Sequence, residues 1–220
     1  MATASTNKKP WATTPFPLLT TPRSLLNGKP ESPASRNATE MALVHNILLR
    51  GLNSIYNQCT SPSLKFSEDI ADFMLFCASF SIVLRSHHAT EESVYFPLLD
   101  SMCSEGRKGV ASTNHDEHET FLPGLQKFDE FVETFRDGEG EGGKIQYNGN
   151  DLKAIIEDFG PKLALHLKNE IVLLESLADD EKIDWGELGR AMAGHSKKVA
   201  DRVCRVFVHP FLDPYGRYVV

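Results

Sequence analysis

The chain has 220 residues, a net charge of −7 at neutral pH and a sequence pI near 5.6. Its length suits one domain, and its 41% hydrophobic and 24% charged residues are ordinary for a soluble globular protein. The acidic balance argues against nucleic acid or an anionic membrane as the main partner, because both need a basic face on the protein.

We expect no secretion, membrane insertion or disulfide framework. The N-terminal residues contain no apolar stretch of signal-peptide length, and no run approaches the ~20 apolar residues of a membrane span. The four cysteines, at positions 59, 77, 103 and 204, stand far apart with no CxxC pair. This usage is typical of a reducing compartment rather than of disulfides or a thiolate metal site, so a cytoplasmic location is expected.

Residues 1–35 are predicted to form an extended arm without helix, because they carry six of the twelve prolines and much serine and threonine. The arm has apolar side chains that can lie along the rest of the protein. These are Trp11, Phe16, Leu18 and Leu19.

Later in the chain, apolar residues recur every three or four positions, which predicts helices at about 38–58, 67–100, 111–136 and 151–178. A fifth helix is expected at about 185–208. Pro123-Gly124 and Gly160-Pro161 predict kinks in the third and fourth helices. The glycine-rich, acidic residues 137–150 predict a mobile loop.

These elements predict an all-α fold, with no convincing strand signal. We expect an antiparallel four-helix bundle over residues 36–180, preceded by the extended arm, 1–35. Residues 181–220 are expected to form an additional C-terminal helix and tail packed on the bundle. The chain gives no clear signal for an oligomeric state.

The unusual feature is where the histidines fall. Five of the eight lie on the apolar stripe of a predicted helix, and each of the four main helices contributes at least one: His45, His87, His115, His118 and His166. Two helices also place a glutamate four residues after a histidine, Glu91 in the second helix and Glu170 in the fourth. At that spacing imidazole and carboxylate share one helix face.

Seven such groups in one core need partners. A single core histidine is more often a hydrogen-bonded packing residue than a ligand. However, each buried polar group without a partner costs on the order of 1–3 kcal/mol, and a divalent metal ion would accept all these lone pairs at once. A nitrogen-rich set with carboxylate and no thiolate suits iron, manganese or zinc.

The ordered motifs resemble hemerythrin-like, or HHE cation-binding, domains, in particular their fungal branch, over about residues 38–178. The resemblance rests on Ala38 to Asn46, Arg50 to Tyr56, and the run His87-His88-Ala89-Thr90-Glu91-Glu92 followed by Phe96-Pro97. It implies non-haem iron, as two ions held by the seven residues named above and bridged by Glu91, Glu170 and an oxo or hydroxo group. Manganese or zinc is the less favoured alternative.

Two motifs depart from those of the oxygen carriers of this family. The third helix carries His115-x-x-His118, whereas carriers have His-x-x-x-His. The fourth carries His166-x-x-x-Glu170, whereas carriers have His-x-x-x-x-Asp. Both departures argue against reversible oxygen carriage while leaving the metal site in place.

Several assignments have alternatives. His88 and Glu92 form a second pair at the same spacing, but their stripe is more polar, so we expect them to be solvated or to lie behind the ligands. Glu119 and Asp116 are candidates to hold a ligand imidazole, although a solvated helix face is the simpler interpretation. For His195 a packing role is favoured.

The sequence supports three hypotheses on function. The first is an oxidoreductase in which dioxygen or peroxide reacts at an open iron position and a small organic substrate is oxidised. The second is a non-catalytic protein that binds, stores or senses dioxygen or iron, which the histidine-rich ligand set favours. The third is an interaction module in which the metal only stabilises the fold.

Overall fold

The computed structural model describes residues 10–109 and 112–194, except for the side chains of residues 10, 11 and 112–116. Two compact units are distinguished, residues 1–85 with 112–179 and residues 86–111 with 180–220, and each is described by itself. No strand occurs among the described residues. The predicted all-α class is therefore confirmed, whereas the predicted domain boundaries stay predictions.

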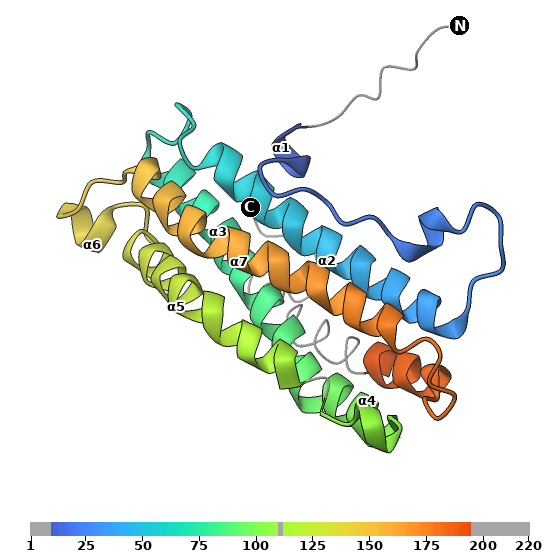
Figure 1. Ribbon diagram of the computed structural model, residues 1–220. Coiled ribbons are helices and arrows are strands. Elements are labelled where there is room, and N and C mark those ends of the chain that lie inside the picture. The colour runs from blue at the N-terminus through green and yellow to red at the C-terminus, as the bar shows by residue number, and fades with distance from the viewer. Residues whose placement is uncertain (1–9, 110–111, 195–220) are drawn as a thin grey trace, which may run out of the picture. The chain divides into compact units, whose positions relative to one another are not determined.

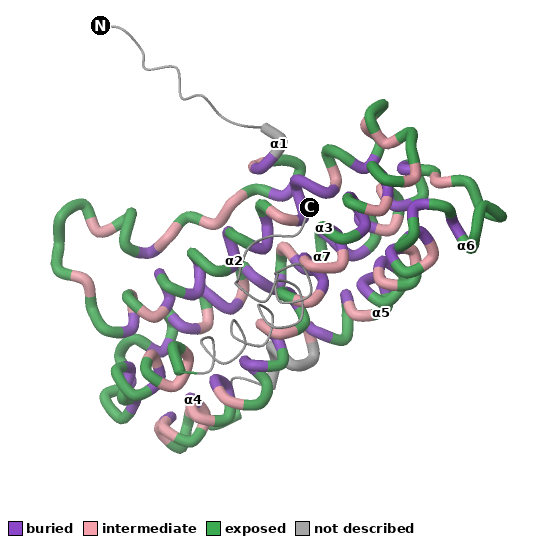
Figure 2. Tube along the Cα trace, turned by 180° about the vertical axis from the view of Figure 1, so that it is seen from behind, coloured by how far each residue is buried: buried purple, intermediate pink, exposed green. Residues whose placement is uncertain are grey.

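The first unit is a bundle of four long helices (Figure 1). Its helices are α2 (Pro33–Gln58), α3 (Ser67–Thr90) up to residue 85, α5 (Ser112–Thr134) and α7 (Gly149–Ser176). Their inward faces are buried and their outer faces exposed (Figure 2). Large side chains such as Phe121, Phe128 and Phe159 are fully buried in the core.

Helices α2 and α7 lie side by side and run antiparallel. The His45 ring, near the middle of α2, reaches the carbonyl oxygen of Leu167, and Tyr56, near the end of α2, donates to Glu157 at 2.7 Å. Residues later in α2 therefore contact residues earlier in α7. This arrangement brings the predicted ligands of both helices to the same level.

Helix α2 begins at Pro33, five residues before its predicted start. Proline suits the first turn of a helix, because its missing N–H has no partner there. The side chain of Ser32 accepts a hydrogen bond from the Ser35 N–H at 3.1 Å and so caps the helix.

The predicted helix over 67–100 is not continuous. A π-helical turn, η2 (Glu91–Tyr95), separates α3 from α4 (Phe96–Met102). Pro97 cannot donate to the carbonyl four residues back, and the preceding N–H, of Phe96, bonds to the Glu91 carbonyl five residues back instead. The proline therefore gives a physical reason for the wider turn.

Helices α5 and α7 continue through Pro123 and Pro161. The glycines beside these prolines have a packing role. A Cβ atom on Gly124 would lie 2.5 Å from the Cβ of Phe159, and one on Gly160 would meet the ring of Phe16. Each glycine thus lets a neighbouring segment approach a helix backbone closely.

In place of the loop predicted between the last two long helices, residues 140–143 form the short helix α6 (Gly140–Gly143). Glu141 there has a φ of 52°, a left-handed conformation that disfavours non-glycine residues. The flanking glycines adopt such angles without a steric penalty, which explains the glycine content of the segment.

The N-terminal arm lies along α2 (Figure 1). The prediction that it contains no helix is wrong. The arm contains the single turn α1 (Pro10–Thr13) and the 3-10 turn η1 (Pro22–Leu25). Asn53 of α2 bonds both the N–H and the C=O of Phe16, at 2.9 and 2.8 Å, and Asn46 does the same for Leu19, at 2.7 and 3.0 Å. Two asparagines seven residues apart therefore fix the arm through its backbone.

The second unit contains η2, α4, the 3-10 turn η3 (Glu105–Arg107) and a helix over residues 185–194. The last of these agrees with the start of the predicted fifth helix, whose remainder lies outside the described residues together with His195. Asp180 joins two segments of this unit by accepting hydrogen bonds from the N–H and hydroxyl of Ser104.

Candidate metal centre

The first unit buries four of the seven predicted ligands, at levels of exposure between 0 and 1%. They are His45, His118, His166 and Glu170. They come from three helices: one from α2, one from α5 and two from α7. Burial of so many ionisable groups is costly unless they are paired or neutralised by a cation.

His45 has a defined tautomer. Its Nδ1 lies 2.8 Å from the backbone carbonyl oxygen of Leu167, and a carbonyl can only accept, so Nδ1 carries the proton. In the neutral ring Nε2 therefore has a lone pair, and it lies 3.1 Å from Oε2 of Glu170. A lone pair and a carboxylate oxygen at this distance require a proton or a metal ion between them.

Glu170 lies between two imidazoles. Oε2 faces His45, and Oε1 lies 3.7 Å from Nε2 of His166. Within the part of the chain that the structure describes, neither oxygen of this buried carboxylate takes part in a hydrogen bond. Two carboxylate oxygens with open lone pairs beside two imidazole nitrogens fit a bound cation.

His118 and His166 point their Nε2 atoms at each other, 3.0 Å apart, from the facing helices α5 and α7. The other nitrogen of His166, Nδ1, lies 3.1 Å from Oε2 of Glu117. Asn169 in turn donates to the second oxygen of Glu117 at 2.7 Å. The His166 ring is therefore held from behind by a carboxylate that is itself fixed.

In the second unit, His87 and Glu91 form the pair predicted from their spacing. Nε2 of His87 lies 2.9 Å from Oε1 of Glu91. A ring nitrogen of His88 also lies within 4.8 Å of a Glu91 oxygen. Glu91 is fully buried, and the π-helical turn begins at this residue. Both neighbouring histidines thus reach one carboxylate.

Of the two alternatives predicted for His88, the solvated one is wrong, and a place behind the ligands stays a prediction. His88 is buried, with 7% of its surface exposed, whereas Glu92 is exposed as expected. The period of 3.6 residues places adjacent residues 100° apart, which made His87 and His88 look like alternatives. The carboxylate of Glu91 lies within reach of both rings, which the stripe pattern did not indicate.

The side chains of His115 and Asp116 lie outside the described residues, so their predicted roles stay predictions. Glu119 is exposed, in line with the solvated interpretation. Sequence reasoning missed Glu117 and Asn169. Glu117 is one residue from His118 and Asn169 one residue from Glu170, so neither lies on the stripe of its neighbouring ligand. Together Glu117 and Asn169 support the His166 ring from behind.

The described cysteines, Cys59, Cys77 and Cys103, are buried free thiols. Burial raises the pKa of each thiol above its usual value, which favours the protonated form over a metal-binding thiolate. None of them belongs to a candidate ligand cluster. The donor set therefore remains imidazole and carboxylate, as the sequence predicted.

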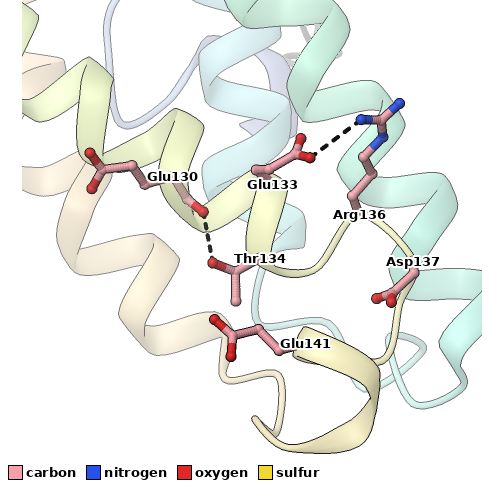
Figure 3. Close-up of a pocket in the computed structure, with 6 residues that line it drawn as sticks. All are labelled: Glu130, Glu133, Thr134, Arg136, Asp137 and Glu141. Atoms are coloured by element: carbon pink, nitrogen blue, oxygen red, sulfur yellow. Dashed lines mark hydrogen bonds and ion pairs between the residues drawn. The ribbon is translucent and has the colours of Figure 1, made fainter.

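Two surface cavities in the first unit are lined by none of the candidate ligands. The larger, of about 750 Å³, lies at the end of α5 beside α6 (Figure 3). Its acidic side chains include Glu133, which pairs with Arg136 at 3.3 Å. The other, of about 530 Å³, includes Lys65 and Lys144 in its lining. Both are separate from the candidate metal centre.

Comparison with known protein families matches residues 37–177 to the hemerythrin HHE cation binding domain. The chain belongs to this family. It is also 30% identical over 190 residues to the "Dimeric xanthone biosynthesis cluster protein R11" of Cryptosporiopsis sp. (strain 8999), covering 84% of this chain and 68% of that fungal protein. No solved structure matches the chain.

Family membership confirms the resemblance found in the motifs and supports a metal-binding helical protein. The match spans all seven predicted ligands, including those of the second unit. No helix among the described residues is both long and apolar enough to cross a membrane.

Proposed function

We propose that this hemerythrin-family protein holds a non-haem centre of two iron ions and uses it to oxidise a small organic substrate with dioxygen or peroxide in the cytosol. The proposed ligands of the first unit are His45, His118, His166 and Glu170, and those of the second unit are His87 and Glu91. His115 stays an additional predicted ligand.

The observation that carries this proposal is the pair formed by His45 and Glu170. Both side chains are fully buried, and the proton on Nδ1 of His45 leaves a lone pair facing a carboxylate oxygen at 3.1 Å. A cation between these atoms removes the repulsion and replaces the lost hydration of both groups.

The donor atoms favour iron. Imidazole and carboxylate without thiolate are typical of non-haem iron sites, and zinc or manganese would accept a similar set. Iron bound there would supply one-electron redox chemistry towards dioxygen. The chain's own residues fix the donor atoms: the Leu167 carbonyl and the Glu117 carboxylate each hold one ring by its Nδ1 proton.

An enzymatic role is supported by the similarity to a protein of a dimeric xanthone biosynthesis cluster. The His-x-x-His and His-x-x-x-Glu spacings, which differ from those of carriers, point in the same direction.

A second candidate function is non-catalytic binding, storage or sensing of dioxygen or iron. Burial favours it, because His45 and Glu170 show no exposed surface. Dioxygen can reach such a sealed site through small fluctuations, whereas an organic substrate needs a larger opening.

The two candidates can be separated with ferrous protein in an anaerobic cuvette. Visible spectra are recorded before oxygen, after oxygen and after evacuation, with metal-free protein as the control. The oxidoreductase proposal predicts a band that decays irreversibly as ferric protein forms. The decay should be faster with a suitable substrate.

A band that disappears on evacuation and returns with oxygen would support the second candidate instead. Iron-loaded protein with no spectral response to oxygen would contradict both oxygen-related functions.

A further inference from the structure

We propose that Glu117 is a positioning residue that makes the ion position served by His118 and His166 the tighter of two, so that two ions bind in sequence. This inference rests on the metal binding proposed above. It assigns a role to a carboxylate that is not itself a ligand and that lies between the two ligand-bearing helices α5 and α7.

The geometry fixes the tautomer of His166. Its Nδ1 lies 3.1 Å from Oε2 of Glu117, and a carboxylate oxygen accepts, so Nδ1 donates and Nε2 keeps the lone pair. That Nε2 lies 3.0 Å from Nε2 of His118. Without metal, His118 donates its Nε2 proton across this contact. A metal ion held there would require the His118 tautomer with its proton on Nδ1, in which both Nε2 atoms carry lone pairs.

Glu117 is itself held in place. Its Oε1 accepts a hydrogen bond from Nδ2 of Asn169 at 2.7 Å, which leaves Oε2 directed at His166. The Glu117 side chain is 25% exposed, whereas that of His166 is 1% exposed. The carboxylate thus brings a negative charge to the back of a buried ring while keeping contact with water itself.

His45 provides the internal comparison. Its Nδ1 proton is also held, but by the neutral backbone carbonyl of Leu167 at 2.8 Å. An anionic acceptor draws the Nδ1 proton away more strongly and so makes the opposite nitrogen a better donor to a metal. The two rings therefore have the same tautomer and unequal donor strength.

The Glu170 carboxylate faces both rings, since its oxygens lie 3.1 Å from Nε2 of His45 and 3.7 Å from Nε2 of His166. The difference between the two positions therefore comes from Glu117, which holds His166 from behind and strengthens its Nε2 as a donor. The position at His118 and His166 should therefore be the first to fill.

The test is a calorimetric titration of the metal-free full-length protein with zinc, which undergoes no redox reaction. The parent protein should bind two ions in two steps of different affinity. Glu117→Gln keeps the size of the side chain and removes its charge. It should weaken the tighter step about 10–100-fold and leave the weaker step unchanged.

Matched variants separate this role from a structural one. Glu119→Gln makes the same change at an exposed position on the same helix and should leave both steps unchanged. Asn169→Ala should weaken the tighter step by less than Glu117→Gln, because Glu117 remains but is no longer fixed. The metal-free forms of all variants should melt close to the parent.

Two equal steps in the parent, or a Glu117→Gln variant with both affinities unchanged, would overturn the inference while leaving the metal-binding proposal intact. An effect of this variant on the weaker step alone would overturn it as well. A parent protein that binds no metal would remove both the inference and the proposed function.

Discussion

At the scale of single residues, the candidate centre depends on what holds each imidazole from behind. His45 and His166 are both buried, and each has its Nδ1 proton fixed by one acceptor. These acceptors leave Nε2 of each neutral ring as the atom that carries the lone pair. A ring held in this way loses little entropy when an ion binds, because its orientation is already set.

The arm allows a direct test of how a side chain of α2 holds the backbone of another segment. Asn53 is fully buried and bonds both the N–H and the C=O of Phe16. Asn53→Ala should leave these two groups without their partner and lower the free energy of unfolding by about 1–3 kcal/mol. Urea denaturation of parent and variant measures the difference.

Asn57→Ala is the matched control, because the contact of Asn57 with the carbonyl of Thr14 in the arm is exposed, unlike those of Asn53. Its effect should stay below about 1 kcal/mol. Equal losses for the two variants would contradict a specific role for Asn53.

Asp180 gives a prediction on pH. Hydrogen bonds from the backbone N–H and the hydroxyl of Ser104 hold the pKa of this carboxyl below its ordinary value of about 3.8. A depressed pKa contributes stability that is present above the ordinary value and is lost as the pH falls through the lower folded value. Asp180→Asn should therefore destabilise the protein at pH 7, and its deficit should shrink below about pH 4.

Thermal melting of parent and Asp180→Asn between pH 3 and 8 provides the comparison. A difference in melting temperature that stays constant over this range would show that the ionised carboxylate contributes nothing.

At the scale of elements, the 3.6-residue period correctly predicted that the bundle has four long helices, because burial of an apolar stripe dominates helix placement. It could not predict the π-helical turn at Glu91, since the cause is a local backbone constraint at Pro97. It also could not predict the start of α2 at Pro33, which depends on the cap formed by Ser32.

The close approach of α5 and α7 leads to a second stability prediction. Gly124 faces Phe159 so closely that a Cβ atom would lie 2.5 Å from the Phe159 Cβ, and Phe159 is fully buried and cannot move aside. Gly124→Ala should cost about 1–3 kcal/mol of stability, despite the higher helix propensity of alanine.

Gly106→Ala is the control for the added methyl group, because no atom lies within 4 Å of the position of its Cβ. Its stability should stay within about 0.5 kcal/mol of the parent. If Gly124→Ala melts at or above the parent temperature, the proposed close packing of α5 against α7 is incorrect.

At the scale of the whole molecule, distant segments together supply the ligands. The predicted ligands His45, His118, His166 and Glu170 meet in the first unit because α2 and α5, which both run antiparallel to α7, place them at one level. Periodicity finds such residues, since they interrupt an apolar stripe. Supporting residues such as Glu117 escape it, because a glutamate on the polar side of a helix looks like any solvated residue.

Metal removal should lower the stability of the whole fold. An ion that binds only the folded state at about 100 times its Kd adds about 2.7 kcal/mol, which corresponds to about 5–10 °C in Tm for a chain of this size. Dialysis against a chelator, followed by calorimetry, should show this loss, and added iron should restore it. An unchanged Tm in protein shown to have lost its metal would contradict the coupling of binding to folding.

The central claim is that the buried histidines and glutamates hold two iron ions. The most direct measurement is the metal content per chain, by mass spectrometry of the elements, of parent protein and of Glu170→Ala after expression with added iron. We predict about two irons per parent chain and a sharp loss in the variant. A parent chain without iron, or a Glu170→Ala variant with the full parental content, would contradict the assignment of this centre.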